Sequence, residues 1–323
     1  MRDEGFEVTA VHYYTGFNGS VGRDIQEGPE VKWTPEQRVV DAAQKLGIRL
    51  LPIDMSPEYS DMLLKPRYGY GSAANPCIDC RILLLKRARE VMTAENAEFV
   101  FTGEVLGQRP MTQFKQTLKL IEKQSGLQGR LLRPLSARFF EPTIPELEGI
   151  VNREHLYDIH GRSRKRQMEL ARSFGIDWYP SSGGGCILTD KSFGKKFHDL
   201  VSHAGGRTFT LDDLYSLKTG RHLRLESGVK VIVGRTYVEN TYLTKLLAAK
   251  HWLFEARDFK GAAVFAFDEP HEEDFYKIAA ITARYSKGVH EHSLVVAAQK
   301  GNIRREFTVK PAEHKDIEPL LIY

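Results

Sequence analysis

Cysteine is scarce in this sequence, because its 323 residues contain only Cys77, Cys80 and Cys186. Three thiols are too few for the disulfide framework of a small secreted protein. Cys77 and Cys80 form a Cys-x-x-Cys motif, which in a cytosolic chain indicates metal or sulfur chemistry. Cys186 lies much later, at the end of a glycine-rich segment. The candidate positions for metal or sulfur chemistry are therefore these three cysteines.

Long apolar runs and extreme charge are lacking too. No stretch approaches the run of about 18 apolar residues that a membrane-spanning helix needs. The N-terminus, MRDEGFEVTA, has neither the apolar core of a secretory signal nor the Arg- and Ser-rich character of a transit peptide. The net charge of +4 is a mild basic excess, compatible with a polyanionic substrate. We therefore expect a cytoplasmic protein with no membrane partner.

The first half of the chain predicts a parallel α/β sheet, because short apolar runs alternate with helical patterns. The segment from about residue 160 to 215 contains a basic amphipathic helix at 162–174, a glycine-rich turn and a helical stretch from about 192 to 215. From residue 230 onward the order strand, helix, strand, helix, strand indicates a separate α+β module. The expected strands of the first half lie at 6–14, 48–53, 98–102 and 130–135, and its expected helices at 33–46 and 77–94.

The beginning of the chain is unusual for such a sheet. An apolar strand at 6–14 follows almost at once after Met1. Parallel sheets are usually covered on both faces, and a doubly wound domain normally carries its ligand loop after the first strand. Two interpretations remain open, a small self-sufficient sheet or a domain whose first βα unit lies upstream of Met1. We favour the second.

The segment N-P-C-I-D-C-R, which runs from Asn75 to Arg81, is the strongest chemical feature. A helix N-terminus and a neighbouring arginine are expected to lower the pKa of Cys77 and Cys80 and to make them reactive. The three thiolates, Cys186 included, suit a 4Fe–4S cluster with one open iron, or a persulfide and disulfide relay between Cys80 and Cys186. A zinc site would need a fourth ligand. Three unrelated buried thiols are the remaining alternative.

Two further segments have weaker signals. The strand at 98–102 ends in Thr102 and Gly103, which suits a close backbone approach to a nucleotide at the carboxyl edge of a sheet. An ordinary turn after a strand explains the same residues. The basic run at 162–166 has enough cations to neutralise several phosphates, or it forms a solvated helix face. Its cations are Arg162, Arg164, Lys165 and Arg166.

Together these segments resemble the PP-loop enzymes that thiolate tRNA, especially the 2-thiouridylase group. The segment from Asn75 to Cys80 is similar to the family's N-P-D-x-x-C, and F-T-G at 101–103 is similar to its A-T-G. The G-C-I sequence around Cys186 resembles the family's G-I-C-F-I-G, and residues 161–176 resemble its preceding basic helix. The resemblance covers roughly residues 5–200.

The resemblance implies a tRNA uridine sulfurtransferase that uses ATP and Mg²⁺ and takes sulfur from a sulfide or persulfide donor. A uridine carbonyl oxygen would be adenylated, Cys186 would carry or present the sulfur, and Cys80 would resolve or ligate. Thr102, Gly103 and His12 would contact the nucleotide. The family's phosphate loop, S-G-G-x-D-S, is missing from this sequence and is expected upstream of Met1. Cys77 replaces an aspartate of the family, which favours the cluster-dependent branch, with Cys77, Cys80 and Cys186 as ligands.

The last hundred residues resemble the NFACT-R RNA-binding domain of ribosome quality-control proteins. The sequence VIVGRTYVEN at 231–240 is similar to its V-G-R-N-x-x-x-N segment, and AAITARY at 279–285 to its A-x-x-x-A-R-Y helix. A role purely in the core for Ile232, Val233, Ala280 and Ala283 is the structural alternative. The resemblance implies a tRNA-binding module, whose candidate contact residues are Arg235, Asn240, Lys245 and Arg284.

The predicted organisation is a PP-loop adenylation domain at 1–180, a cysteine loop and helical connection at 181–226, and an RNA-binding domain at 227–323. The predicted fold class is α/β, with a parallel sheet of the adenine nucleotide alpha hydrolase type that lacks its first βα unit, plus a C-terminal α+β domain. Two alternatives stay open. The chain is a non-catalytic tRNA- or RNA-binding protein derived from such an enzyme, or its PP-loop domain acts on a small molecule.

Overall fold

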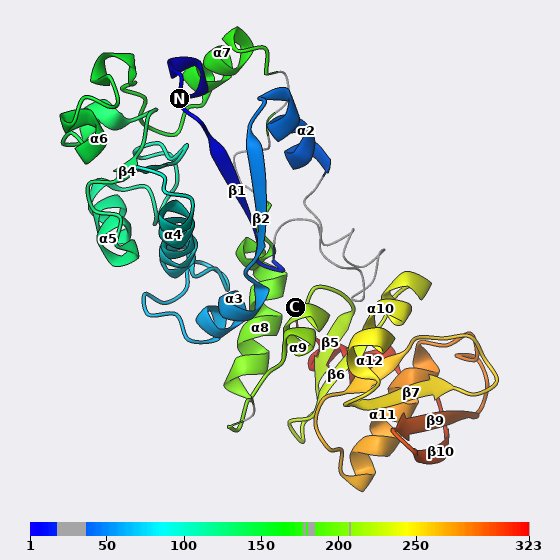
Figure 1. Cartoon of the computed structure of the whole chain (residues 1–323). Coiled ribbons are helices and arrows are strands. Elements are labelled where there is room, and N and C mark those ends of the chain that lie inside the picture. Colours follow the sequence, from blue (N-terminus) through cyan, green and yellow to red (C-terminus); the bar gives the residue numbers. More distant parts are fainter. Residues whose placement is uncertain (18–36, 177–178, 180–184, 207, 323) are drawn as a thin grey trace. The chain divides into compact units, whose positions relative to one another are not determined.

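The computed structural model describes residues 1–17, 37–176, 179, 185–206 and 208–322, without the side chain of Arg38 (Figure 1). The chain divides into two compact units, and each is described by itself. The first unit comprises Met1–Tyr13, Pro35–Gly71 and Asn75–Gly184, and the second comprises Tyr14–Thr34, Ser72–Ala74 and Gly185–Tyr323. Most of the predicted connection at 181–226 thus lies in the same unit as the C-terminal sheet.

The strands of the first unit form two separate small sheets in the part of the chain that the structure describes. Strand β1 (Thr9–Tyr14) pairs with β2 (Arg49–Asp54), and β3 (Val100–Phe101) pairs in parallel with β4 (Leu131–Leu132). Each expected strand is present, but β3 and β4 are shorter than expected. The single continuous parallel sheet stays a prediction.

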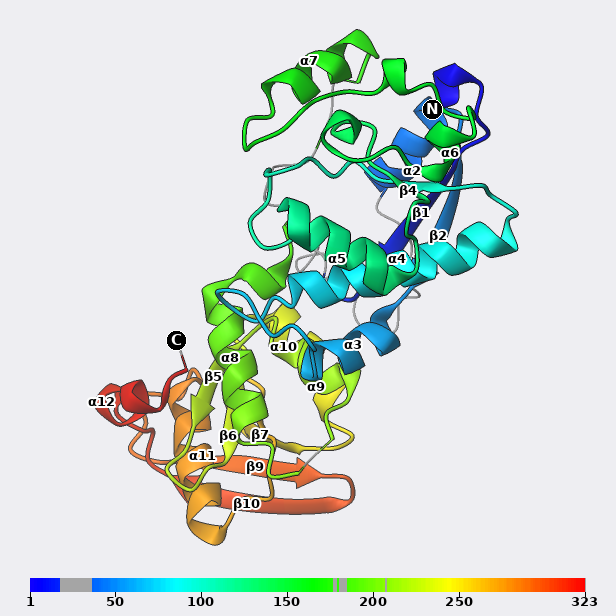
Figure 2. The same ribbon diagram turned by 90° about the vertical axis from the view of Figure 1, so that its left-hand side faces the viewer.

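Helices of the first unit cover these strands. Helix α4 spans Cys77–Ala94, the range that the sequence predicts, and it lies beside α5 (Lys115–Ser125) (Figure 2). Their apolar faces meet in a core around Ile82, Leu85 and Ile121. Of the helix expected at 33–46, residues 33–36 lie outside the described residues. The remaining helical segments are η1 (Arg2–Glu4), α2 (Gln37–Lys45), α3 (Ser56–Leu64), η2 (Ala137–Phe139), α6 (Ile144–Leu147), η3 (Arg153–His155) and α7 (Lys165–Ser173).

The second unit is built on a six-stranded antiparallel sheet with the order β10-β9-β7-β8-β6-β5. The sequence predicted a single strand where the structure has β7 and β8, and another where it has β9 and β10. The strands are β5 (Arg221–Arg224), β6 (Lys230–Val233), β7 (Trp252–Ala256), β8 (Val264–Ala266), β9 (Leu294–Lys300) and β10 (Ile303–Val309).

Helix α11 (Glu272–Arg284) packs against β7, β9 and β10 and closes the core of this unit (Figure 1). Its buried residues Phe275 and Ile278 join Phe254 of β7 and Val296 of β9. The core placement of Ile232, Val233 and Ala283 is confirmed, since all three are fully buried. The other helical segments are η4 (Ile187–Thr189), α8 (Lys191–Ser202), α9 (Leu211–Ser216), α10 (Tyr237–Leu247), α12 (His314–Ile317) and η5 (Glu318–Leu320).

Candidate functional site

Two thiols lie on the first turn of α4. Cys77 is the first residue of the helix, and Cys80 follows one turn later, so both lie on neighbouring positions of one helix face. The Nδ2 of Asn75 donates to the Sγ of Cys77 at 3.1 Å. The buried carboxylate of Asp79 accepts the backbone amides of residues 67 and 68 at 3.0 and 2.9 Å, and so fixes the loop before the helix. The thiols therefore sit in a well-anchored turn.

The pKa of the Cys80 thiol is raised, not lowered as the sequence predicted. Burial raises it above its ordinary value of 9.0, while a hydrogen bond with Tyr59 and the charge of Arg81 lower it. The prediction is wrong for Cys80 because desolvation of a thiolate outweighs both favourable interactions. Cys80 is accordingly a protonated thiol at neutral pH, and a thiol is a far weaker nucleophile than a thiolate.

Arg109 interacts electrostatically with Cys77, Arg81, Glu104 and Arg164, and we call these five residues the thiol–arginine site. The pKa of Arg109 is lowered by burial and by the positive charges of Arg81 and Arg164, while Cys77 and Glu104 raise it. Arg81 Nε lies 3.6 Å from Glu104 Oε1. The Cys-x-x-Cys motif, the strand end and the basic helix thus meet in one unit. Their excess of positive charge favours an anionic ligand.

Glu104 joins this site to the interior of the first unit. Its Oε2 accepts from Arg133 Nε at 3.2 Å and from the hydroxyl of Thr102 at 3.3 Å. Arg133 also donates to Glu122 at 2.9 Å. Because Glu104 and Arg133 are only 3% and 4% exposed, this is a buried ion pair. The predicted site residues did not include Glu104, although an acidic residue directly after a strand end was its signal.

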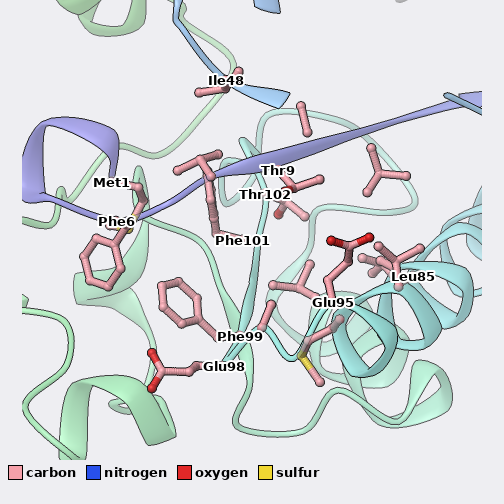
Figure 3. Close-up of a pocket in the computed structure, with 18 of the residues that line it drawn as sticks. Met1, Phe6, Thr9, Ile48, Leu85, Glu95, Glu98, Phe99, Phe101 and Thr102 are labelled. Carbon is pink, nitrogen blue, oxygen red and sulfur yellow. The ribbon is translucent and has the colours of Figure 1, made fainter. Parts of the chain in front are cut away.

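Of the three residues expected to contact a nucleotide, Thr102 and Gly103 are neighbours in the chain just after β3, and His12 lies on β1. Thr102 lines a cavity of about 820 Å³ that also includes Arg81 (Figure 3). Gly103 and His12 are not among its described lining residues. A Cβ at Gly103 would meet nothing within 4 Å, so the space beside this backbone is open. A nucleotide contact by Thr102, Gly103 and His12 stays a prediction.

The basic run at 162–166 straddles the start of α7, which begins at Lys165. Arg162, Lys165 and Arg166 are exposed. Arg166 pairs with Asp158 at 2.8 Å, and the guanidinium of Arg164 lies 5.5 Å from the ring centroid of Tyr179. This run therefore divides into a solvated part and Arg164, which belongs to the thiol–arginine site.

Cys186 lies in the second unit, directly before η4. The amide of Ile187 donates to the carbonyl of Phe17 at 3.2 Å, and that of Ala74 to the carbonyl of Leu188 at 3.1 Å. Ala74 precedes Cys77 by three residues in the chain. Within the described residues, no group of three or more His, Cys, Asp or Glu side chains is arranged to hold a metal ion. The two units are not placed relative to one another, so the convergence of the three thiols stays a prediction, and residues 180–184 of that loop lie outside the described part.

In the second unit, the connection from β6 to α10 contains the V-G-R segment. Asn240 Oδ1 accepts the amide of Ala263 at 3.2 Å, and its Nδ2 donates to the carbonyl of Gly261 at 3.1 Å. A Cβ at Gly234 would lie 2.1 Å from Asn240 Oδ1, so no side chain fits there. Asn240 thus holds α10 against the β7–β8 connection, and an RNA contact by Asn240 stays a prediction.

An exposed basic edge borders this connection. Arg235 is bound by Glu239, whose carboxylate accepts its backbone amide at 2.8 Å and its Nε at 3.0 Å. Tyr237, the first residue of α10, is 84% exposed. Hydrogen bonds from Lys287 N to Lys260 O and from Ala262 N to Tyr285 O, at 2.8 and 3.0 Å, join two further loops here. The Arg221 guanidinium lies 5.2 Å from the ring centroid of Tyr285. The basic edge comprises Arg221, Arg235, Tyr237, Lys260 and Lys287.

Two of the predicted RNA contacts lie beyond this edge. Lys245 is exposed, two turns further along α10, and Arg284 is the half-buried last residue of α11. Tyr237 was not among the predicted RNA contacts. An aromatic residue at the first position of a helix, close to an arginine, is the pattern that could have indicated it.

Comparison with known proteins finds a family that is similar to the larger part of the second unit. The family described as NFACT protein RNA binding domain matches residues 220–320, which contain the whole six-stranded sheet together with α10 and α11. The predicted resemblance of this region is thereby confirmed, and this part of the chain is similar to an RNA-binding domain. No curated protein matches the chain. The C-terminal part of the fibronectin/fibrinogen-binding protein from Streptococcus suis is a similar solved structure, at 15% identity and a TM-score of 0.30, over 75% of this chain and 95% of that one.

Proposed function

We propose that this protein binds tRNA through the basic edge of its second unit. The match of residues 220–320 to an RNA-binding domain carries the proposal. Lysine and arginine side chains neutralise phosphates, and an exposed tyrosine offers a face on which an unpaired base stacks. Arg235 and Tyr237 supply both features at the start of α10, where the helix dipole and the first backbone amides add positive potential.

Fluorescence anisotropy with a labelled tRNA transcript, titrated at several salt concentrations, tests the proposal. The variant Arg235→Ala, Lys260→Ala, Lys287→Ala removes three cations of the basic edge. We expect weaker binding and a shallower salt slope, by roughly 0.7 to 0.9 for each phosphate that the variant no longer neutralises.

A matched control removes three cations elsewhere in the same unit, the exposed Lys277 and Arg304 and the half-buried Lys300, as Lys277→Ala, Lys300→Ala and Arg304→Ala. Each of these pairs with a carboxylate, and none belongs to the basic edge. Equal loss of affinity in the two triple variants, or unchanged binding by the first, contradicts the proposed location.

A second proposed function, ATP-dependent tRNA uridine sulfur transfer, is supported by the thiol–arginine site. In this reaction the uridine carbonyl oxygen attacks the α-phosphorus of ATP, and pyrophosphate leaves. A sulfur nucleophile then attacks the activated carbon, and AMP leaves with the oxygen. Arg81, Arg109 and Arg164 would bind the phosphates together with Mg²⁺, since they form a cationic cluster at the carboxyl end of β3.

The cysteines have proposed roles in the same reaction. Cys186 would carry the sulfur from a sulfide or persulfide donor, and Cys80 would resolve the product or ligate. A 4Fe–4S cluster, if bound, would be held by Cys77, Cys80 and Cys186 and would supply an open iron for sulfide. The anchored turn of Cys77 and Cys80 suits such ligands, because both thiols lie on one helix face.

Mass spectrometry of nucleosides from total tRNA, in cells with and without the gene, tests the second function. Loss of one thiolated uridine on deletion, restored by the native gene but not by Cys186→Ala, is the expected result. An unchanged thionucleoside profile contradicts sulfur transfer and leaves tRNA binding as the function.

A further inference from the structure

Helix α8 packs on the sheet of the second unit, although it lies outside residues 220–320, which match the RNA-binding family. Asp199 of α8 accepts from Arg224 Nη2 of β5 and from Lys230 Nζ of β6, both at 2.6 Å (Figure 2). Lys230 is fully buried, so these ion pairs lie in the interior of the unit. Breaking such a pair is costly, because it leaves a buried charge unpaired. Helix α8 is therefore a fixed neighbour of β5 and β6.

Lys196 of α8 lies one turn before Asp199, on the same face of the helix. Its Nζ donates to the carbonyl of Gly220 at 3.4 Å. Gly220 has a φ of +77°, and a Cβ there would lie 2.9 Å from Ile232 Cγ2. The turn before β5 thus packs directly on β6 and accepts no side chain at this position. The half-buried Lys196 is held against this tightly packed turn.

Lys196 forms no ion pair with a carboxylate within the described part of the chain, and the bond to Gly220 is its one hydrogen bond there. The positive charge of Arg235 disfavours its protonation, while Asp190 and Glu239 favour it. Both carboxylates have other partners. Asp190 accepts a backbone amide of the first turn of α8 at 2.8 Å, and Glu239 binds Arg235. A half-buried cation beside a second cation is costly, so this position favours an external anion.

Arg235 leaves one side of its guanidinium open to the same anion. Glu239 accepts from its Nε at 3.0 Å and from its Nη2 at 2.5 Å, whereas its Nη1 donates to no residue that the structure describes. The Arg235 side chain is 48% exposed. Arginine suits a phosphate because it presents several N–H donors in a planar fork. Lys196 and Arg235 therefore provide two neighbouring cations for one phosphate, where α8 meets the basic edge.

We propose that Lys196 of α8 binds a phosphate of the RNA together with Arg235, so that the RNA-binding surface extends beyond the residues that match the family. This inference rests on the proposed tRNA binding. Burial and the charge of Arg235 lower the pKa of the Lys196 amine to about 8. A bound phosphate favours the protonated amine, so RNA binding is coupled to proton uptake above that pH. Affinity for RNA is accordingly expected to fall as the pH rises through 8.

Of the other groups that interact electrostatically with Lys196, Lys230 titrates in the same range. Burial lowers the pKa of Lys230 to about 8 as well, but its fully buried amine is out of reach of RNA. Burial also lowers the pKa of His222 well below 6.5, so this ring stays uncharged. Burial would raise the pKa of Glu239, but hydrogen bonds with Arg235 lower it, and the same bonds raise the pKa of Arg235. Both therefore keep their charge, and the test has to separate Lys196 from Lys230.

Fluorescence anisotropy with a labelled tRNA transcript, at fixed salt between pH 7 and pH 9, tests the proposal. The native chain should lose affinity about tenfold over this range, because a group with a pKa of about 8 has to take up a proton. Lys196→Arg keeps its charge at pH 9 and should abolish most of this loss. Lys196→Met should bind roughly tenfold more weakly at pH 7, with a flat pH profile and a salt slope shallower by roughly 0.7 to 0.9.

Lys195→Met is the matched control, since Lys195 is exposed and points about 100° away around α8. It should leave affinity and pH profile unchanged, and urea unfolding checks that each variant is folded. If Lys196→Met does not fold, the pH profile of Lys196→Arg decides. A loss of affinity that persists in Lys196→Arg belongs to Lys230 or to the RNA and overturns the proposal. Native affinity of Lys196→Met, or equal weakening by Lys195→Met, also overturns it.

The result also separates this inference from the function on which it rests. A native chain that does not bind tRNA refutes the proposed function and the Lys196 contact together. Binding that is weakened by the triple variant of the basic edge but not by Lys196→Met refutes the Lys196 contact alone.

Discussion

Replacing Asn240 by alanine removes the two hydrogen bonds that join α10 to the β7–β8 connection. The first is a bond from Nδ2 to the carbonyl of Gly261 in a partly exposed position, and it contributes about 1 kcal/mol. The second leaves the amide of Ala263, a residue only 2% exposed, without its acceptor, at a cost of about 1–3 kcal/mol. We therefore expect Asn240→Ala to lower the unfolding free energy of the second unit by about 2–4 kcal/mol.

Urea unfolding followed by tryptophan fluorescence measures this loss, since Trp252 lies in the core of the second unit. Asn240→Asp is the comparison variant, because it keeps the acceptor for Ala263 but replaces the Nδ2 donor by a carboxylate oxygen that faces the Gly261 carbonyl. We expect its loss to be at least about 1 kcal/mol, the value of the bond to Gly261. Equal stability of Asn240→Ala and the native chain would refute the positioning role of Asn240. Normal stability with strongly weakened tRNA binding would show instead that Asn240 contacts RNA directly.

Further predictions concern the basic edge, the buried ion pair, a buried lysine and Cys80. Tyr237→Ala is expected to weaken tRNA binding roughly tenfold without changing stability, because a stacking face is lost from an exposed position. Glu104→Gln removes the charge of one of the two carboxylates that pair with the buried Arg133 and leaves Glu122 at 2.9 Å, so calorimetry should show a loss of about 1.5–3 kcal/mol. Burial lowers the pKa of Lys230 from 10.5 to about 8, so the unfolded state binds more protons between these values and stability rises with pH across that window. Lys230→Met should flatten that rise, as measured by urea unfolding from pH 8 to 9.5. Alkylation of Cys80 by iodoacetamide at pH 8 should be slower in the folded chain than in urea, because burial raises its pKa.

Two of these predictions have a control variant in the same unit, and the other two have an outcome that would contradict them. Tyr276 is 51% exposed and lies near the N-terminal end of α11. The variant Tyr276→Ala should leave tRNA binding unchanged. Glu148→Gln, at an exposed carboxylate of the first unit, should change stability little, and a loss equal to that of Glu104→Gln would contradict the buried-pair argument. A rise in stability above pH 8 that persists in Lys230→Met would assign it to another group. Alkylation of Cys80 at the same rate in folded and unfolded chains would contradict its raised pKa.

Local patterns predicted the elements whose signals lie within one turn or one strand. The sequence predicts both observed ends of helix α4, because Pro76 precedes its first residue and apolar residues recur on one face along it. The β9–β10 hairpin was missed, although Gly301 and the following asparagine form the two-residue connection between Lys300 and Ile303. Because the prediction merged β9 and β10 into one strand, it did not identify the antiparallel sheet of the second unit.

The thiol–arginine site shows why the rest could not be predicted. Arg81, Arg109 and Arg164 come from three distant segments, and only Arg81 and Arg164 belong to motifs that the sequence analysis singled out. The pKa of Cys80 was predicted in the wrong direction because neighbours in sequence reveal nearby charges but not desolvation. Packing of the first unit decides both properties.

The pKa shifts of Cys80 and Arg109 have a common cause with different consequences for the proposed reaction. Burial favours the neutral form of each group, so it raises the pKa of the thiol and lowers that of the guanidinium. A bound phosphate would compensate the crowded arginines, whereas its negative charge would make Cys80 still harder to deprotonate. Cys80 thus becomes a weaker nucleophile when the anion that suits the site arrives. This supports the proposed division of roles, in which Cys186 and not Cys80 carries the sulfur to the activated uridine.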